Sequence, residues 1–299
     1  MPNWDSVLRE ISTVQATRTE SPHDKVRRKY LSRLHAHTGR NIIAYYSGFL
    51  TKRIEGIEIS DEDKNGFMLC IHQLDRSKGL DLILHTPGGD SQATISLVDY
   101  LRAMFGSDIR ALVPQIAMSA GTMIACSCRE IVMGKQSSLG PIDPQFGVIA
   151  AANLLEEVKK ASDQIAKDPR RAMFWQPILG QITPSFLQRC EIAVRDSKDF
   201  LTKTLGQNML RGEVEPERTR KIEKISGLLG NDDGRAHNTH INADECEASG
   251  LNVARLESDP VLQDLLLTTH HCYMHSLSNT PAFKIIENHK GRCLVKMQQ

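Results

Sequence analysis

The sequence lacks long apolar runs, an excess of either charge, and a pattern of paired cysteines. No stretch approaches the roughly 18–20 apolar residues that a membrane-spanning helix needs. Lysine and arginine number 37 against 36 acidic residues, which gives no support for binding to nucleic acid or to a membrane surface. Seven scattered cysteines are typical of reduced thiols, and the first residues lack the basic and apolar regions of a signal peptide. These absences predict a cytoplasmic protein with neither a nucleic-acid nor a membrane partner.

Strand patterns alternate with helical patterns over the first half of the chain, after two predicted helices within residues 4–34. Strands that alternate with helices of this length favour right-handed crossovers and parallel pairing. Active sites in such sheets lie where strands end and helices begin. The predicted strands cover residues 41–49, 80–85, 109–114 and 131–133, and the predicted helices cover 60–74, 92–104 and a segment starting at Ser119.

The second half of the chain is dominated by helical patterns. Residues 150–229 are helix-rich and polar, apart from a compact apolar cluster within 173–179. A loop is expected at 230–234, followed by a helix that ends near Gly250. The rest of the chain predicts one helix over about 260–275 and a strand close to its end.

Two apolar runs end at small residues and lead into helical patterns, residues 83–90 (ILHTPGGD) and 116–122 (IAMSAGT). Glycine tolerates positive φ, so a turn at Gly88 and Gly89 can leave backbone N–H groups unpaired and pointing outward. Taken alone, Ser119 would be interpreted as a helix N-cap. A serine hydroxyl beside outward amides nevertheless supplies what acyl transfer requires, a nucleophile and donors for the oxyanion that it creates.

With residues 138–145 (SLGPIDPQ), these motifs resemble the Clp-fold serine proteases of the ClpP/crotonase superfamily, and most of all their serine dehydrogenase proteinase branch. Signal-peptide peptidase A-like proteins are more distant relatives. The resemblance implies an α/β fold of stacked β-β-α units with a parallel sheet, N-terminal helices and a helix-rich insertion. It implies a serine endopeptidase that hydrolyses peptide or protein substrates through an acyl-enzyme, with no cofactor.

The resemblance also implies how the chain is organised. An N-terminal helical segment would cover residues 1–40, a peptidase core 41–253, and a C-terminal extension 254–299. The helical insertion at about 150–229 would mediate assembly into a homo-oligomer that encloses its sites. Neither the subunit number nor an unfoldase partner follows from the sequence.

Each candidate site residue takes its role from the same resemblance. Ser119 would be the nucleophile, and the backbone N–H groups of Gly89 and Ala120 would form the oxyanion hole. The Ser-His-Asp order of the most studied Clp proteases is broken, because no histidine follows Ser119 before His237. The serine dehydrogenase proteinase branch uses the order Ser-Asp-His, which assigns the orienting carboxylate to Asp143 and the base to His237.

Alternatives to this assignment stay open. His240 would be the base if the alignment of this segment is shifted by one turn. In a Ser/Lys dyad of the kind that signal-peptide peptidase A-like proteins use, Lys160 is a candidate base, as are Lys159 and Lys135. The same fold also accommodates crotonase-like acyl-CoA chemistry or a catalytically inactive scaffold.

Some further residues suggest metal chemistry that we do not assign. Cys126 and Cys128 form a lone C-x-C without the second cysteine pair of a zinc site. His271 and His275 share one helix face, but no glutamate completes an H-E-x-x-H motif. His85 lies beside the glycine turn and is expected to be structural or to line the substrate site.

Overall fold

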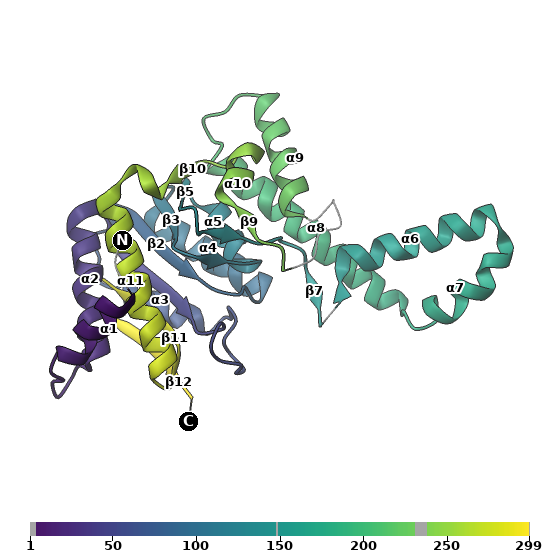
Figure 1. The fold of residues 1–299 in the computed structure, drawn as a ribbon. Helices are drawn as coiled ribbons and strands as arrows, with labels where there is room; N and C mark the ends of the chain where they lie inside the picture. The colour runs from purple at the N-terminus through teal and green to yellow at the C-terminus, as the bar shows by residue number, and fades with distance from the viewer. Residues whose placement is uncertain (1–3, 148, 231–237, 299) are drawn as a thin grey trace.

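A seven-stranded, mostly parallel β-sheet forms the centre of the protein, in the order β10-β5-β3-β2-β1-β11-β12 (Figure 1). The computed structural model describes residues 4–147, 149–230 and 238–298. The first five strands in this order pair in parallel, whereas β11 and β12 are antiparallel. The expected α/β fold with a parallel sheet is confirmed, with an antiparallel pair added at one edge. In chain order the strands are β1 (Asn41–Ser47), β2 (Leu80–His85), β3 (Ile109–Val113), β5 (Glu130–Met133), β10 (Val253–Arg255), β11 (Ala282–Asn288) and β12 (Cys293–Met297).

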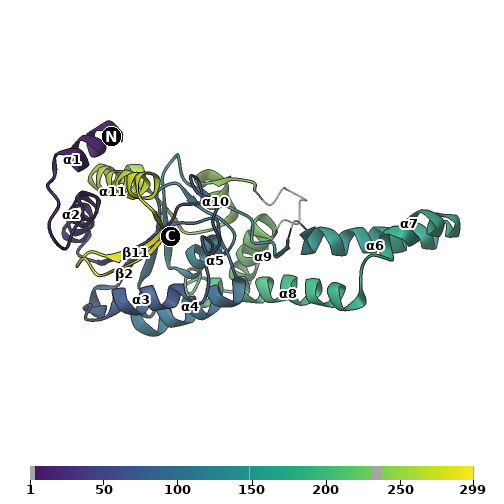
Figure 2. The same cartoon turned by 90° about the horizontal axis from the view of Figure 1, so that it is seen from below.

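Helices cover both faces of this sheet (Figure 2). Successive residues of a strand point to opposite faces, and β1 follows this rule: Ile43 packs among the crossover helices, whereas Ile42 packs against the N- and C-terminal helices. A sheet buried on both faces explains the continuous apolar runs in the sequence. The crossover helices are α3 (Asp63–Ile71), α4 (Ser91–Phe105) and α5 (Ala120–Ser127), and the opposite layer comprises α1 (Trp4–Thr13), α2 (Pro22–Thr38) and α11 (Pro260–Asn279).

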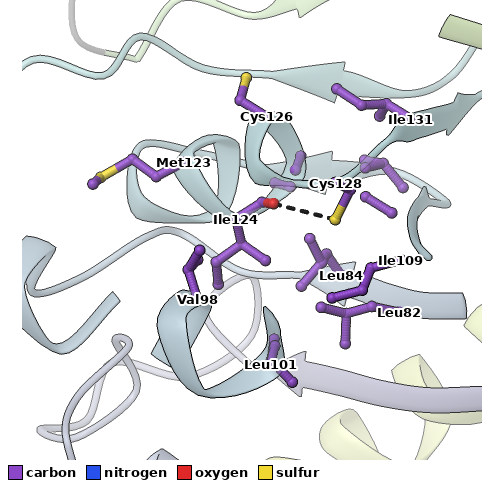
Figure 3. Packing of buried hydrophobic residues seen from close by; sticks show 14 of the residues in the cluster. Leu82, Leu84, Val98, Leu101, Ile109, Met123, Ile124, Cys126, Cys128 and Ile131 are labelled. Carbon is purple, nitrogen blue, oxygen red and sulfur yellow. Dashed lines mark hydrogen bonds between the residues drawn. The ribbon is translucent and has the colours of Figure 1, made fainter. Parts of the chain in front are cut away.

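The core beneath the crossover helices contains the C-x-C pair (Figure 3). Cys126 and Cys128 are both buried on α5, and the Cys128 thiol donates to the carbonyl of Ile124 over 3.3 Å. Burial raises the pKa of Cys128 to about 12 and that of Cys126 well above its usual range. Both thiols therefore stay protonated and pack as small apolar side chains.

Short strands join the loops that follow the central strands. Strands β4 (Ile116–Ala117) and β6 (Ser138–Leu139) are parallel, and β9 (Ile241–Asn242) is antiparallel to β6. Thr86, just beyond β2, pairs in parallel with Ala117, and this pairing brings the ends of two motifs together. Strands β7 (Gln145–Phe146) and β8 (Ile149–Ala150) form a separate hairpin, and α10 (Ala243–Ser249) follows β9.

A helical arm projects from the core between β8 and β9 (Figures 1 and 2). Met173 and Phe174 lie on the arm with 83% and 66% of their surface exposed, while Leu201 and Leu205 of its returning helix belong to the main core. The prediction of a helix-rich segment at 150–229 is confirmed. Its helices are α6 (Ala151–Lys167), α7 (Ala172–Leu179), α8 (Pro184–Gln207) and α9 (Glu217–Leu229), and 3₁₀ helices occur at Arg76–Lys78, Pro169–Arg171 and Leu256–Ser258. Among the described helices, none is both long and apolar enough to cross a membrane.

Candidate active site

Ser119 lies in the sharp turn between β4 and α5. Its backbone has φ 48° and ψ −111°, a region that residues other than glycine rarely adopt. Strain of this kind costs on the order of 1–3 kcal/mol and persists only where the surroundings impose it. Ser119 occupies the N-cap position of α5, but its hydroxyl forms no capping hydrogen bond. The side chain is therefore held at the helix start without the stabilising role that a cap serine normally has.

The glycine turn after β2 passes directly against this serine. Gly88 and Gly89 have φ of 107° and 155°. A Cβ on Gly88 would lie 2.8 Å from the Cβ of Ser119, and a Cβ on Gly89 would overlap the backbone of Ile59. Both positions require glycine, because any side chain would push the turn away from Ser119 or from Ile59.

One peptide plane in this turn points an amide into the site. The N–H of Ile59 donates to the carbonyl of Gly88 over 2.8 Å. A trans peptide is planar, so its N–H points opposite to its C=O, and the Gly89 N–H is directed away from Ile59. Within the described chain, neither this N–H nor that of Ala120, at the first position of α5, donates to another atom. The two unpaired amides flank Ser119, where the helix N-terminus adds partial positive charge.

A cavity of about 470 Å³ lies over the serine and the two glycines. Its far wall is formed by residues 142–147 and by Ala193 and Ser197 of α8. A second cavity of about 230 Å³ between α4 and α8 adjoins it and shares Met123 and Phe146. The returning helix of the arm therefore builds part of the site, a contribution that no motif in residues 184–207 had indicated.

Asp143 lines the same cavity and is 2% exposed. Its carboxylate accepts a hydrogen bond from the side-chain amide of Gln145 over 3.0 Å. The preceding segment is tied to α5 by Thr122, whose hydroxyl donates to the carbonyl of Gly140 over 2.9 Å. The structure thus brings Asp143 and Ser119 to one cavity. The sequence analysis missed Thr122, although a polar residue one turn into an apolar helix was a visible signal.

The candidate bases are distributed differently. His237 lies outside the described residues. His240 is exposed, and its Nδ1 lies 2.7 Å from the Ser138 hydroxyl; it does not line the cavity. Lys159 and Lys160 are exposed on α6 of the arm, and Lys135 is exposed in a turn. None of these lysines lines the cavity.

Two other histidines, His275 and His85, pack against aromatic rings. The His275 ring packs against that of Trp4 with 3.9 Å between ring centroids and an interplanar angle of 43°, and its Nε2 lies 3.2 Å from the Trp4 carbonyl. His85 is fully buried against Tyr46, Phe49 and His270, with ring centroids 5.0–5.4 Å away. Neither ring nitrogen of His85 has a hydrogen-bond partner among the described residues, and burial lowers its pKa to about 3.

The buried His85 ring predicts a loss of stability in mild acid. The unfolded chain binds a proton at this histidine below about pH 6.5, whereas the folded protein binds it only below about pH 3. The free energy of unfolding therefore falls as the pH decreases from about 6.5 to about 3. His85→Phe keeps the ring packing and removes the titration. Between pH 7 and pH 5, urea unfolding of the wild type should lose about 2 kcal/mol more than the variant does. Parallel pH profiles for the two proteins would contradict this expectation.

The mostly parallel sheet, with the glycine turn packed against the strained serine, matches a ClpP-like α/β fold. A model of the ClpP-like SDH-type serine proteinases matches residues 19–254, and the chain belongs to this family. The resemblance drawn from the three motifs is thereby confirmed.

Curated relatives from one archaeon also match the chain. It is 29% identical over 196 residues to an uncharacterized protein of Methanocaldococcus jannaschii, covering 65% of this chain and 60% of that protein. It is 32% identical over 110 residues to a second uncharacterized protein of the same organism, covering 37% of each. The chain therefore spans less than two thirds of the length of these relatives, and neither carries a described activity.

Proposed function

We propose that this protein is a serine endopeptidase that hydrolyses peptide bonds through an acyl-enzyme. The observation that carries the proposal is the strained Ser119 turn at a cavity of about 470 Å³, beside the N–H groups of Gly89 and Ala120, which donate to no other atom of the described residues. Strain in a nucleophile turn persists where function requires it. A binding protein would have no need for a serine held in this conformation.

In the proposed reaction, the Ser119 hydroxyl oxygen attacks the scissile carbonyl carbon and its proton passes to the base. The carbonyl oxygen becomes an oxyanion, which accepts hydrogen bonds from the N–H groups of Gly89 and Ala120. The C–N bond then breaks and the base returns the proton to the departing amine. A water molecule, deprotonated by the same base, hydrolyses the resulting ester and releases the acid product.

We assign the base to His237 and the orienting carboxylate to Asp143, in the order Ser-Asp-His. The placement of Asp143 in the serine's cavity supports this order. The alternatives receive less support. His240 is engaged with Ser138, and Lys160 lies on the arm. Crotonase-like chemistry would use the amides for an enolate but gives no reason for the strain at Ser119.

A fluorophosphonate probe tests the proposal directly. An activated serine attacks the phosphorus atom of the probe and stays covalently bound to it. We expect the probe to label the folded protein at Ser119, identified by peptide mass spectrometry, and to block hydrolysis of fluorescently labelled casein. A folded protein that is neither labelled nor hydrolytic would refute the peptidase and leave the scaffold or acyl-CoA alternative.

We further propose that the protein is a homo-oligomer assembled through its helical arm. Met173 and Phe174 are exposed on the arm. Large apolar side chains clustered on a protein surface are typical of interfaces with other proteins. Trp175 beside them is buried within the arm, so this apolar surface has a packed support. Assembly would hide the proteolytic sites from other proteins in the cell.

The oligomer proposal predicts a mass in solution that is a multiple of the 33.4 kDa chain. Light scattering at micromolar concentration should detect it. The double substitution Met173→Glu and Phe174→Glu should lower the mass, because it buries charge in the interface. Val214→Glu, at a 75% exposed position outside the arm helices, is the matched control and should not. A wild-type mass near 33.4 kDa would contradict the oligomer but leave the peptidase proposal intact.

A further inference from the structure

The direction of the Gly89 N–H depends on Ile59, a residue that does not itself line the cavity. Ile59 holds the Gly88 carbonyl by its N–H, and its own carbonyl accepts from the N–H of Asp90 over 2.9 Å. Ile59 therefore forms hydrogen bonds with the peptide units on both sides of Gly89. It belongs to no helix or long strand, so its own position must be set by other contacts.

Lys284 of β11 provides these contacts on both sides of Ile59. Its ammonium is fully buried and donates to the carbonyl of Glu58 over 2.6 Å and to both carboxylate oxygens of Asp63 over 2.9 Å. Asp63, itself fully buried, accepts from the N–H of Ser60 over 3.1 Å. The residues before and after Ile59 are therefore both tied to one buried ion pair.

The neighbouring strand β1 forms further hydrogen bonds that hold the segment around Ile59. Ser47 ends β1, lies opposite Lys284 in the sheet, and donates to the carbonyl of Ile57 over 2.6 Å. Tyr45 of the same strand donates to Asp63 over 2.8 Å. A buried ion pair whose remaining hydrogen bonds are satisfied is rigid, because any movement would leave a charge uncompensated.

We infer that Lys284 and Asp63 are positioning residues for the oxyanion hole, acting through Ile59 on the Gly88–Gly89 peptide. The inference rests on the proposed peptidase function and extends it to β11. This strand lies outside the residues that match the family model, 19–254. In this chain β11, which lies between β1 and the edge strand β12, therefore also supports the site.

The test compares two substitutions that each remove a buried charge from β11. Lys284→Met removes the tie to the Ile59 segment. Glu287→Gln removes the partner of Arg27 and Arg28 on the opposite face of the strand, away from the cavity. Labelling kinetics with a rhodamine fluorophosphonate give the maximal rate, the half-saturating concentration and the labelled fraction separately.

We expect Lys284→Met to lower the maximal labelling rate by between about tenfold and 10²-fold, the upper figure being the loss of one oxyanion donor. The half-saturating concentration should change less than the maximal rate, because the cavity walls formed by residues 142–147 and by α8 do not contact Lys284. A purely structural role would reduce the labelled fraction and leave the rate of the remaining sites unchanged. Glu287→Gln should keep the wild-type rate even where its thermal stability falls.

A wild-type rate per labelled site in Lys284→Met would overturn the inference while leaving the peptidase proposal in place. Absence of labelling in the wild type would overturn both. Should Lys284→Met not fold, Asp63→Asn decides the question, because it keeps the size of the side chain and removes the negative charge that holds the Lys284 ammonium. A several-fold slower rate in that variant supports the inference, and an unchanged rate overturns it.

Discussion

Replacing Ser119 with alanine is expected to lower kcat for casein hydrolysis by at least ~10⁴-fold and to abolish fluorophosphonate labelling. The variant loses the only atom that forms the covalent intermediate, while the oxyanion amides and the cavity remain. Its folding should be preserved, because the hydroxyl makes no hydrogen bond that caps α5. Initial rates at saturating substrate, together with thermal melts, provide the measurement.

The strained backbone supplies an internal check on this variant. Ser119→Gly also removes the hydroxyl but suits a positive φ, so it should be more stable than Ser119→Ala by about 1 kcal/mol. Ser249→Ala, at a buried serine that does not line the cavity, is the matched control for losing a hydroxyl. Turnover by Ser119→Ala within about tenfold of the wild type, equivalent to ~1.4 kcal/mol of barrier, would remove Ser119 as nucleophile.

The second large effect is expected from the base and its orienting carboxylate. His237→Ala should lower kcat nearly as far as loss of Ser119, and Asp143→Asn by about 10⁴-fold, because the carboxylate holds the imidazole in the correct tautomer. The double variant of Ser119 and His237 should be little worse than either single variant, since such groups act as a unit. Steady-state kinetics at saturating substrate measure each effect.

The competing assignments predict different inactive variants. His240→Ala should retain activity if its ring serves only to bind Ser138, and Lys160→Ala should retain activity as an exposed arm residue. Loss of turnover in His240→Ala, with His237→Ala still active, would identify His240 as the base. Loss in Lys160→Ala, with both histidine variants active, would establish a Ser/Lys dyad instead.

The elements that sequence analysis predicted well are those whose signals are local. The two helices expected within residues 4–34 are present as α1 and α2, and Ser21 forms a capping box at the start of α2. The strand Leu80–His85 has its predicted bounds, because its apolar run ends at the Thr-Pro-Gly-Gly turn. At the C-terminal end, one predicted strand proved to be the antiparallel pair β11 and β12. No local pattern indicates that β11 pairs with β1, more than 200 residues earlier in the chain.

By itself, the sequence determined the family to which this protein belongs, and it predicted the residues that carry the proposed chemistry. Glycine at positions 88 and 89 is a requirement of backbone sterics, and a serine at the start of a helix is visible as a residue type, so both can be read from the sequence. Only the tertiary structure decided that Ile59 orients the Gly89 amide and that Lys284 holds the Ile59 segment. These contacts join backbone groups and a buried ion pair across the sheet, and backbone amides carry no residue-specific signal in a sequence.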